Sequence, residues 1–332
     1  MPVGSSKLSM SGIMQNKLLK AMPKTIKVFD GLDRPFDYNT ENLVNTVHAS
    51  NANLRNTVSR MAMVGDRKVL KDEKSGFQFS STQAMDNGGK ANLASMEVVN
   101  ETDTGATRFW YAENSKYDTN EGALVNVSNP YFAMNEAYGA ENTLNLSESS
   151  KLKLSLQTGQ NGLYERDYEQ DNHSFDEQSH ALNAEYSYNM TDYLELSALG
   201  GMLYENDAVL GMNGVGGFSI KDSSTYFMGI KAALNLTDNI SLMASYYRGY
   251  TNGADASMLS ISDLETESFM LAGEYAIDKK NKVGLSLVSP LSVVKGSASF
   301  NYATGRDNYS DTIYMNKLNV ESNGTSTYLV YE

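Results

Sequence analysis

The sequence predicts an all-β fold, an antiparallel up-and-down meander, and three observations support this prediction. Apolar and polar residues alternate in runs of about nine to eleven residues, as expected when successive side chains point to opposite faces of a strand. The connections between these runs alternate between short polar turns and long polar loops. One hairpin pattern is also repeated, since "YSYNMTDYLELSAL" (186–199) is followed by "LNLTDNISLMASYY" (234–247). Each copy therefore describes two strands with one apolar face and one polar face.

Strand and loop lengths favour a barrel that crosses a membrane over a soluble sandwich. A tilted strand crosses a bilayer with about nine to eleven residues, whereas strands of soluble domains usually have about five or six. The short turns lie at Thr191-Asp192, Thr237 to Asn239 and Lys279 to Asn281. The long connections cover residues 158–179, 204–224 and 250–267. This asymmetry is typical of outer-membrane barrels, so we expect these three loops to be extracellular.

The side chains of the predicted strands divide into a lipid-facing set and a lumen-facing set. Leu, Ile, Ala and Tyr of the apolar faces are expected to contact lipid. Tyrosines gather near strand ends, where amphipathic rings favour the membrane interface, at Tyr186, Tyr188, Tyr193, Tyr204, Tyr226, Tyr246, Tyr250 and Tyr275. The polar faces are expected to line the lumen with Lys151, Lys153, Glu185, Glu195, Lys231 and Glu274.

The chain is expected to have three regions. Residues 1–25 are small and polar and predict a linker. Residues 26–64 predict a short hairpin in "IKVFDGLDRPFDY", followed by an amphipathic helix over residues 41–64. The helical spacing is carried by Val44, Val47, Leu54, Val58 and Met61. This helix would pack against the hairpin or lie in the lumen as a plug. Residues 65–332 predict the barrel, with weaker strand signals up to residue 149.

Composition excludes several classes of protein. The net charge of -13 argues against a nucleic-acid partner, and no basic stripe interleaved with aromatics is present. No apolar run approaches the roughly 18 residues of a membrane helix. The absence of cysteine fits passage through an oxidising periplasm. The first residues contain no apolar core of a signal peptide, so we expect either an internal protein or the downstream piece of a longer precursor.

Several motifs follow one another in a set order along residues 26–332. They are "VFDGLDRPFDY", Asn129-Pro130-Tyr131-Phe132, "AVLGMNGVGGFSI" (208–220), "SFMLAGEYA" (268–276), "KVGLSLVSPLSVVKGSASF" (282–300) and "ATGRD" (303–307). In sequence and order they resemble the C-terminal autotransporter region of bacterial subtilisin-like serine proteases, whose barrel begins near the motif matched by residues 129–132. The resemblance implies a passenger protease upstream, a barrel of about 10 to 12 strands when complete, and further C-terminal strands beyond "STYLVYE".

No catalytic, cofactor or metal site is predicted in this chain. The three histidines, His48, His173 and His180, lack the surroundings of a Ser-His-Asp triad, and Gly324-Thr325-Ser326 does not continue as a nucleophile motif. The acidic loop "YERDYEQDNHSFDEQSH" fits no calcium-loop spacing. We therefore expect this chain not to be an enzyme, although the resemblance implies a full-length parent that is a subtilisin-like serine endopeptidase.

Together these features predict an outer-membrane anchor and translocator for an upstream passenger. The expected partners are outer-membrane lipid, the barrel-assembly machinery and the chain's own passenger in cis. Two alternatives stay open, a stand-alone outer-membrane pore or adhesin barrel and a soluble β-rich binding domain. Passenger identity, its cleavage and the strand count of the closed barrel are not determined by the sequence.

Overall fold

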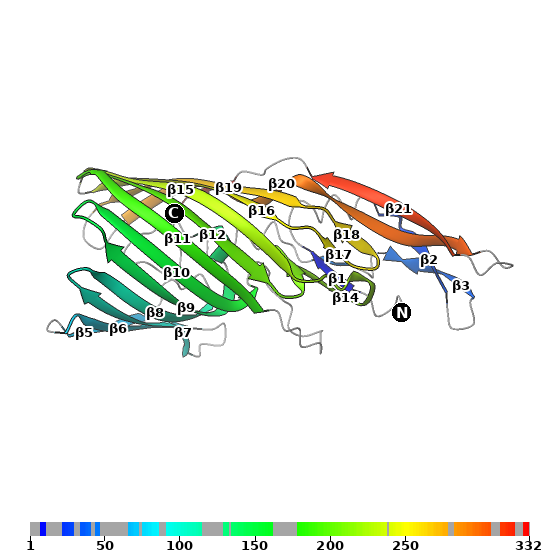
Figure 1. Cartoon of the computed structure of the whole chain (residues 1–332), viewed down its shortest axis with the longest axis horizontal. Coiled ribbons are helices and arrows are strands. Elements are labelled where there is room, and N and C mark those ends of the chain that lie inside the picture. Colours follow the sequence, from blue (N-terminus) through cyan, green and yellow to red (C-terminus); the bar gives the residue numbers. More distant parts are fainter. Residues whose placement is uncertain are drawn as a thin grey trace.

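Strands dominate the computed structural model of this chain (Figure 1). The described residues are 7–10, 22–29, 34–40, 44–46, 66–72, 75–85, 91–114, 129–132, 134–161, 178–237, 239–277, 282–306, 313–322 and 328–331. Within this part of the chain lies a sheet of 16 strands, and each of its pairings is antiparallel. No helix among the described residues is long and apolar enough to span a bilayer.

Strands that follow one another along the chain are neighbours across most of the sheet, as the meander predicts. In sheet order the long strands are β5 (Asp66–Asp72), β6 (Phe77–Met85), β7 (Ala91–Thr102), β8 (Gly105–Asn114), β9 (Met134–Asn145), β10 (Ser150–Asn161), β11 (Gln178–Thr191), β12 (Leu194–Glu205), β15 (Ser223–Thr237), β16 (Ile240–Thr251), β19 (Leu264–Ala276) and β20 (Lys282–Arg306). The short strands β17 (Ala254–Asp255), β18 (Leu259–Ile261), β21 (Ile313–Ser322) and β22 (Tyr328–Tyr331) join around β20.

Strand β20 changes partners in its middle. Its first half pairs with β19 as far as Lys295, and its second half pairs with β18 and β21 from Gly296 onward. Gly296 has φ +143°, a backbone conformation that L side chains rarely adopt, which explains glycine at this change of direction. The β20–β21 hairpin therefore extends from one end of the sheet (Figure 1).

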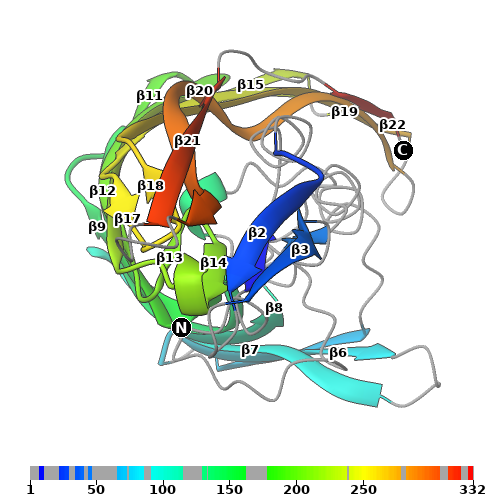
Figure 2. The same cartoon turned by 90° about the vertical axis from the view of Figure 1, so that its right-hand side faces the viewer.

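The sheet curls around a central axis (Figure 2). Its two faces have opposite chemistry along β11. Along β11 every second residue from Ser179 to Ser187 is buried, whereas the intervening side chains are exposed. The exposed set includes Leu182, Tyr186 and Tyr188. An apolar face points outward and a polar face points inward, which is the side-chain distribution of a transmembrane β-barrel. The predicted fold class is confirmed.

The two copies of the repeated hairpin turn in the same way. In the first copy the hydroxyl oxygen of Thr191 accepts the backbone N–H groups of Tyr193 and Leu194. In the second copy Thr237 accepts those of Asn239 and Ile240. A threonine hydroxyl replaces a backbone acceptor in both tight turns, which explains why the same residue stands at the same place in each copy.

The N-terminal region contains the predicted hairpin and also strands that the sequence did not predict. β2 (Thr25–Phe29) and β3 (Pro35–Asn39) pair as the hairpin. The helix predicted over residues 41–64 is wrong where the structure describes it, because β4 (Val44–Thr46) pairs in parallel with β1 (Lys7–Met10). β-Branched Val44 and Thr46 suit an extended strand, and pairing with a neighbouring strand overrides helical spacing. The remainder of 41–64 lies outside the described residues.

These N-terminal strands meet the long connections at one end of the sheet. β1 pairs with β14 (Met212–Val215), which forms a small hairpin with β13 (Ala208–Val209). Met22 and Ile26 belong to an apolar cluster that also contains Phe218, Leu259 and Phe300. Phe218 lies in the 3₁₀ turn η5 (Gly216–Phe218). The cluster thus joins residues 22–26 to the connections before β15 and β19 and to the second half of β20.

A buried carboxylate holds the β13–β14 hairpin closed. Leu210 and Gly211, at its tip, both have positive φ, as a two-residue turn of this type requires. Their backbone N–H groups each donate to Glu205 over 2.7 Å, and Glu205 is fully buried. The positive φ at the tip accounts for Gly211, the first glycine of the "AVLGMNGVGG" stretch.

Glycines on the inner face make room for aromatic rings. A Cβ on Gly201 would lie 2.1 Å from the carbonyl oxygen of Leu182 and 2.5 Å from the ring of Phe227. The ring of Tyr247 covers Gly229 and that of Trp110 covers Gly139 in the same manner. Large rings can therefore lie flat against the inner wall because their neighbours have no side chain.

We predict that Gly201→Ala destabilises the barrel by about 1–3 kcal/mol, because the added methyl group overpacks against backbone and a buried ring. Gly200→Ala is the matched control, since a Cβ there meets only the carbonyl oxygen of Phe227 at 3.6 Å. Urea unfolding in detergent, followed by the heat-dependent shift in gel mobility, measures both. Equal stability of the two variants would contradict the packing that we describe.

Candidate functional site

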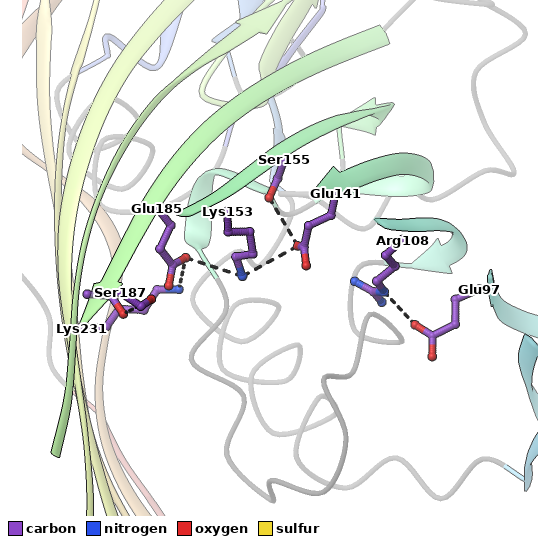
Figure 3. Close-up of polar contacts among 9 residues, drawn as sticks. Glu97, Arg108, Glu141, Lys153, Ser155, Glu185, Ser187 and Lys231 are labelled. Atoms are coloured by element: carbon purple, nitrogen blue, oxygen red, sulfur yellow. Dashed lines mark hydrogen bonds and ion pairs between the residues drawn. The ribbon is translucent and has the colours of Figure 1, made fainter. Parts of the chain in front are cut away.

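A line of ion pairs crosses the inner face of the sheet (Figure 3). The carboxylate of Glu185 on β11 forms an ion pair with the amine of Lys231 on β15 at 2.7 Å. The same carboxylate lies 3.7 Å from the amine of Lys153 on β10. Lys153 in turn lies 3.7 Å from Glu141 on β9. Acidic and basic groups alternate along this line, so the attraction between neighbours offsets the cost of removing each charge from bulk water.

The polar band continues to both sides of these four residues. On β7 and β8, Glu97 accepts a hydrogen bond from Arg108 over 2.7 Å and another from Ser80. Arg108 also lies over the ring of Trp110. Nearer the short turns, the hydroxyl groups of Ser187 and Ser197 are 2.8 Å apart and buried.

All six residues predicted for the lumen lie on the inner face. Lys153, Glu185 and Lys231 are joined in the ion-pair line, and Lys151 bonds Glu195 over 2.8 Å in a more exposed pair. Glu274 is buried on β19. The alternation of residues alone predicted that these side chains lie on the inner face, because the odd or even position of a residue along a strand determines the face to which it points. The pairing of Lys231 with Glu185, 46 residues away, required the register of three strands.

An aromatic cluster fills the part of the interior nearer the long connections. Tyr131, in the 3₁₀ turn η4 (Pro130–Phe132), stacks on Phe227 with ring centroids 4.6 Å apart. Phe132 meets the same ring edge-on. The other buried members of the cluster are Met134, Ala137, Ala181, Leu199, Leu203 and Tyr247. Sequence alone marked Asn129-Pro130-Tyr131-Phe132 only as the start of a barrel, and its position inside the lumen was missed.

On the outer face, tyrosines and carboxylates mark the end of the strands at the long connections. The hydroxyl of Tyr204, at the end of β12, donates to Asp222 just before β15 over 2.7 Å, and the hydroxyl of Tyr250 donates to Asp263 just before β19. Each aspartate also accepts a loop N–H group, from Asp207 and Gly253 respectively. The recurring "YEN" and "YTN" at residues 204 and 250, each followed by a pre-strand aspartate, is the sequence signal for these Tyr–Asp bridges.

An ion cluster lies beside the second bridge. Arg248 bonds Glu265 over 2.6 Å and lies 3.7 Å from Glu267, while Lys295 bonds Glu265 over 2.8 Å. Arg248 has the same parity on β16 as Leu242, Tyr246 and Tyr250, which places it on the outer face. The cluster therefore marks a polar boundary of the outward apolar surface.

Of the candidates for chemistry that the sequence raised, His180 lies among the described residues. His180 lies on the outer face, with its ring nitrogen 2.8 Å from the hydroxyl of Thr158 and its ring stacked on Tyr204. His48, His173 and Ser326 lie outside the described residues, as does most of the acidic loop. Within the part of the chain that the structure describes, no group of three or more acidic or histidine side chains is arranged to hold a metal ion.

Comparisons with known proteins find similarity only among solved structures. No protein-family model and no curated protein matches the chain. A loop L8 deletion mutant of OmpT, an outer membrane protein of Vibrio cholerae, matches with TM-score 0.39 and 11% identity, over 92% of this chain and 93% of that one. In-vitro folded OmpT of Vibrio cholerae matches with TM-score 0.36 and 11% identity, over 80% of this chain and 89% of that one. A mutant porin of Rh. blastica matches with TM-score 0.30 and 14% identity, over 68% of this chain and 85% of that one. TM-scores below 0.5 at this identity carry no weight for function.

We predict that Lys231→Met destabilises the barrel by about 3 kcal/mol, because it leaves the buried carboxylate of Glu185 without its closest cation. Lys151→Met is the control. It breaks the more exposed pair with Glu195 and is expected to cost about 0.5 kcal/mol. Urea unfolding in detergent compares the two. A larger loss for the control than for Lys231→Met would show that the inner band is not buried as described.

The Tyr–Asp bridges predict that the stability of the connections before β15 and β19 depends on pH. Hydrogen bonds from Tyr204 and from the Asp207 N–H group hold the pKa of Asp222 below its usual range, and Tyr250 and Gly253 do the same for Asp263. A lowered folded pKa stabilises the bridge above the ordinary pKa of an aspartate, near 4. This stabilisation is lost as pH falls through the folded pKa.

Amide hydrogen exchange checks this pH dependence. Protection of the Asp207 and Gly253 amides is expected to fall in the acid range, since their acceptors become protonated. The neighbouring amides of Asn206 and Asn252 bond the backbone oxygens of Gln178 and Ser224 and are internal controls. If all four amides lose protection together, the aspartates are not what holds these loops.

Proposed function

We propose that this chain is the outer-membrane anchor and translocator of a passenger domain that precedes it. The observation that carries the proposal is the placement of the N-terminal strands. β1 pairs with β14, and the β2–β3 hairpin lies beside the second half of β20, all at the end of the sheet with the long connections. In outer-membrane barrels the long loops are extracellular. A domain attached ahead of residue 7 would then be held at the cell surface.

The outer face supports a position within lipid. On β15 the outward side chains from Tyr226 to Leu234 are Tyr, Met, Ile, Ala and Leu, and on β11 those from Leu182 to Tyr188 are Leu, Ala, Tyr and Tyr. Strand β12 lies between β11 and β15 in the sheet, and exposed apolar side chains on neighbouring strands form a belt that water solvates poorly. Antiparallel pairing satisfies the backbone groups between strands, as the bilayer core requires. The Arg248 cluster suits the interface, where charge costs only about 0–1 kcal/mol.

The polar inner face supports a route for an extended chain. Lys153, Glu185, Lys231 and the serines beside them offer hydrogen bonds and balanced charge rather than an apolar surface to which a passing chain would adhere. We propose a subtilisin-like serine protease as the passenger, on the motifs from "VFDGLDRPFDY" to "ATGRD". In this proposal the barrel itself carries no catalytic residue, and it reaches the membrane through the barrel-assembly machinery.

We predict that a small test domain placed before Met1, behind a secretion signal, appears on the surface of intact Gram-negative cells. Added protease is expected to remove it without breaking the outer membrane, because the N-terminal strands lie at the extracellular end. The same domain inserted between Asp192 and Tyr193, in a short turn at the opposite end, is the control and is expected to be protected. The test domain secreted without the barrel should stay in the periplasm.

Protection of the test domain before Met1 would overturn the translocator proposal. A barrel that forms with its N-terminus inside, and that conducts ions, would leave a stand-alone pore as its function. A monodisperse protein in buffer without detergent would favour the soluble β-rich domain. Mobility of unheated and heated samples on gels, with and without detergent, separates that outcome from the other two.

A further inference from the structure

The turn at residues 129–132, hereafter the inner turn, lies inside the curled sheet and contacts strands far from its own position. It immediately precedes β9, yet Tyr131 stacks on Phe227 of β15 and its hydroxyl is 2.8 Å from that of Thr266 on β19. Along the sheet, β19 is six strands from β9. With neighbouring strands about 4.8 Å apart, the wall between them is about 29 Å long. Tyr131 is far too short to follow the wall, so the inner turn crosses the interior.

Several contacts hold the inner turn in this position. The carbonyl oxygen of Phe132 accepts a hydrogen bond from the side-chain amide of Gln157 on β10, and the carboxamide oxygen of Asn129 accepts the N–H group of Tyr131. Tyr131 is 1% exposed. Gly249 on β16 leaves space for it, since a Cβ there would lie 2.3 Å from the tyrosine hydroxyl. The turn is thus tied to β10 on one side and to β15, β16 and β19 on the other.

The surroundings of the inner turn are not fully satisfied. Among the described residues, the side-chain nitrogen of Asn129 and the carboxamide oxygen of Asn183 are buried without hydrogen-bond partners. Asn183 pairs across β11 and β12 with Gly201, which is next in register to Phe227, so it lies in the row of the stacked ring. A buried polar group without a partner destabilises the fold, and a hydrogen bond to a water molecule would remove this cost. If the inner turn moved out of this position, water could reach these groups and form the missing hydrogen bonds. This gain lowers the free-energy cost of displacing the turn.

We propose that the inner turn, held by Tyr131 against Phe227, Gly249 and Thr266, is the element that restricts the size of what passes through the barrel. Past it, towards the short turns, the wall is the polar band of Lys153, Glu185 and Lys231, which is suited to hydrated solutes. The aromatic cluster lies in the interior at the level of the inner turn, and a passing passenger would displace this turn from its contacts with Phe227 and Thr266. This inference rests on the proposed membrane barrel and extends it by naming where passage is limited.

The test measures ion conductance of the refolded chain in planar lipid bilayers, together with the swelling of proteoliposomes in neutral sugars of increasing size. Thr266→Val removes the hydrogen bond to Tyr131 while keeping the volume of the side chain. Gly249→Ala pushes the tyrosine hydroxyl out of its seat. Both variants are expected to raise conductance about twofold or more and to admit larger sugars than the unaltered chain, because pore width limits both.

Matched controls separate this effect from general loosening of the barrel. Thr251→Val removes an equally buried bond between threonines, to Thr225, that does not involve the inner turn. Gly200→Ala adds a methyl group on the outer face, in ordinary contact. Both controls are expected to conduct as the unaltered chain does. All samples must show the heat-dependent gel shift of a folded barrel.

Unchanged conductance and sugar cut-off in both Thr266→Val and Gly249→Ala, or equal increases in the controls, would overturn the inference. The absence of conductance in every sample would do the same, because another element would then block the barrel. Surface exposure of a test domain before Met1 is a separate readout, so failure of the translocator proposal is recognised independently.

Discussion

Period-two alternation of side chains, fixed by antiparallel pairing, is the constraint on which the rest of this structure depends. Each strand bonds its backbone to two neighbours, and the pleat then sends alternate residues to opposite faces. A shift of register by one residue would place Glu185 and Lys231 on the apolar side and Leu182 and Ile230 inside. The chemical contrast between the faces therefore fixes the register, and the register in turn aligns the ion pairs.

Among the described residues, two kinds of interaction lie in the interior at different levels. Towards the short turns, carboxylates and amines from β9 to β15 alternate so that each charge has an opposite neighbour. Towards the long connections, aromatic rings lie against glycines, and the inner turn is bonded to Thr266. In our proposal the polar level accommodates hydrated solutes, whereas the aromatic level excludes them by bulk. Passage through the barrel would consequently depend on the aromatic level, which a turn outside the strands controls.

The connections before β15 and β19 are held by specific contacts. Tyr–Asp bridges tie the ends of β12 and β16 to the starts of β15 and β19, and buried Glu205 closes the β13–β14 hairpin. β1 adds to the edge of that hairpin, and Met22 and Ile26 pack on Phe218 and Phe300. The same features that order these connections hold the N-terminal region beside them, which would set the position of any upstream domain.

The sequence by itself determined the fold class, the faces of the strands and the short turns at Thr191 and Thr237, because these depend on residues close together along the chain. It also located Lys153, Glu185 and Lys231 on the inner face by parity, although not their pairing. It failed at residues 44–46, where apolar spacing predicted a helix and pairing with β1 gave a strand. Only the tertiary structure decided that Tyr131 crosses the interior to Thr266, 135 residues away. That contact depends on the curvature of the whole sheet, which no local pattern records.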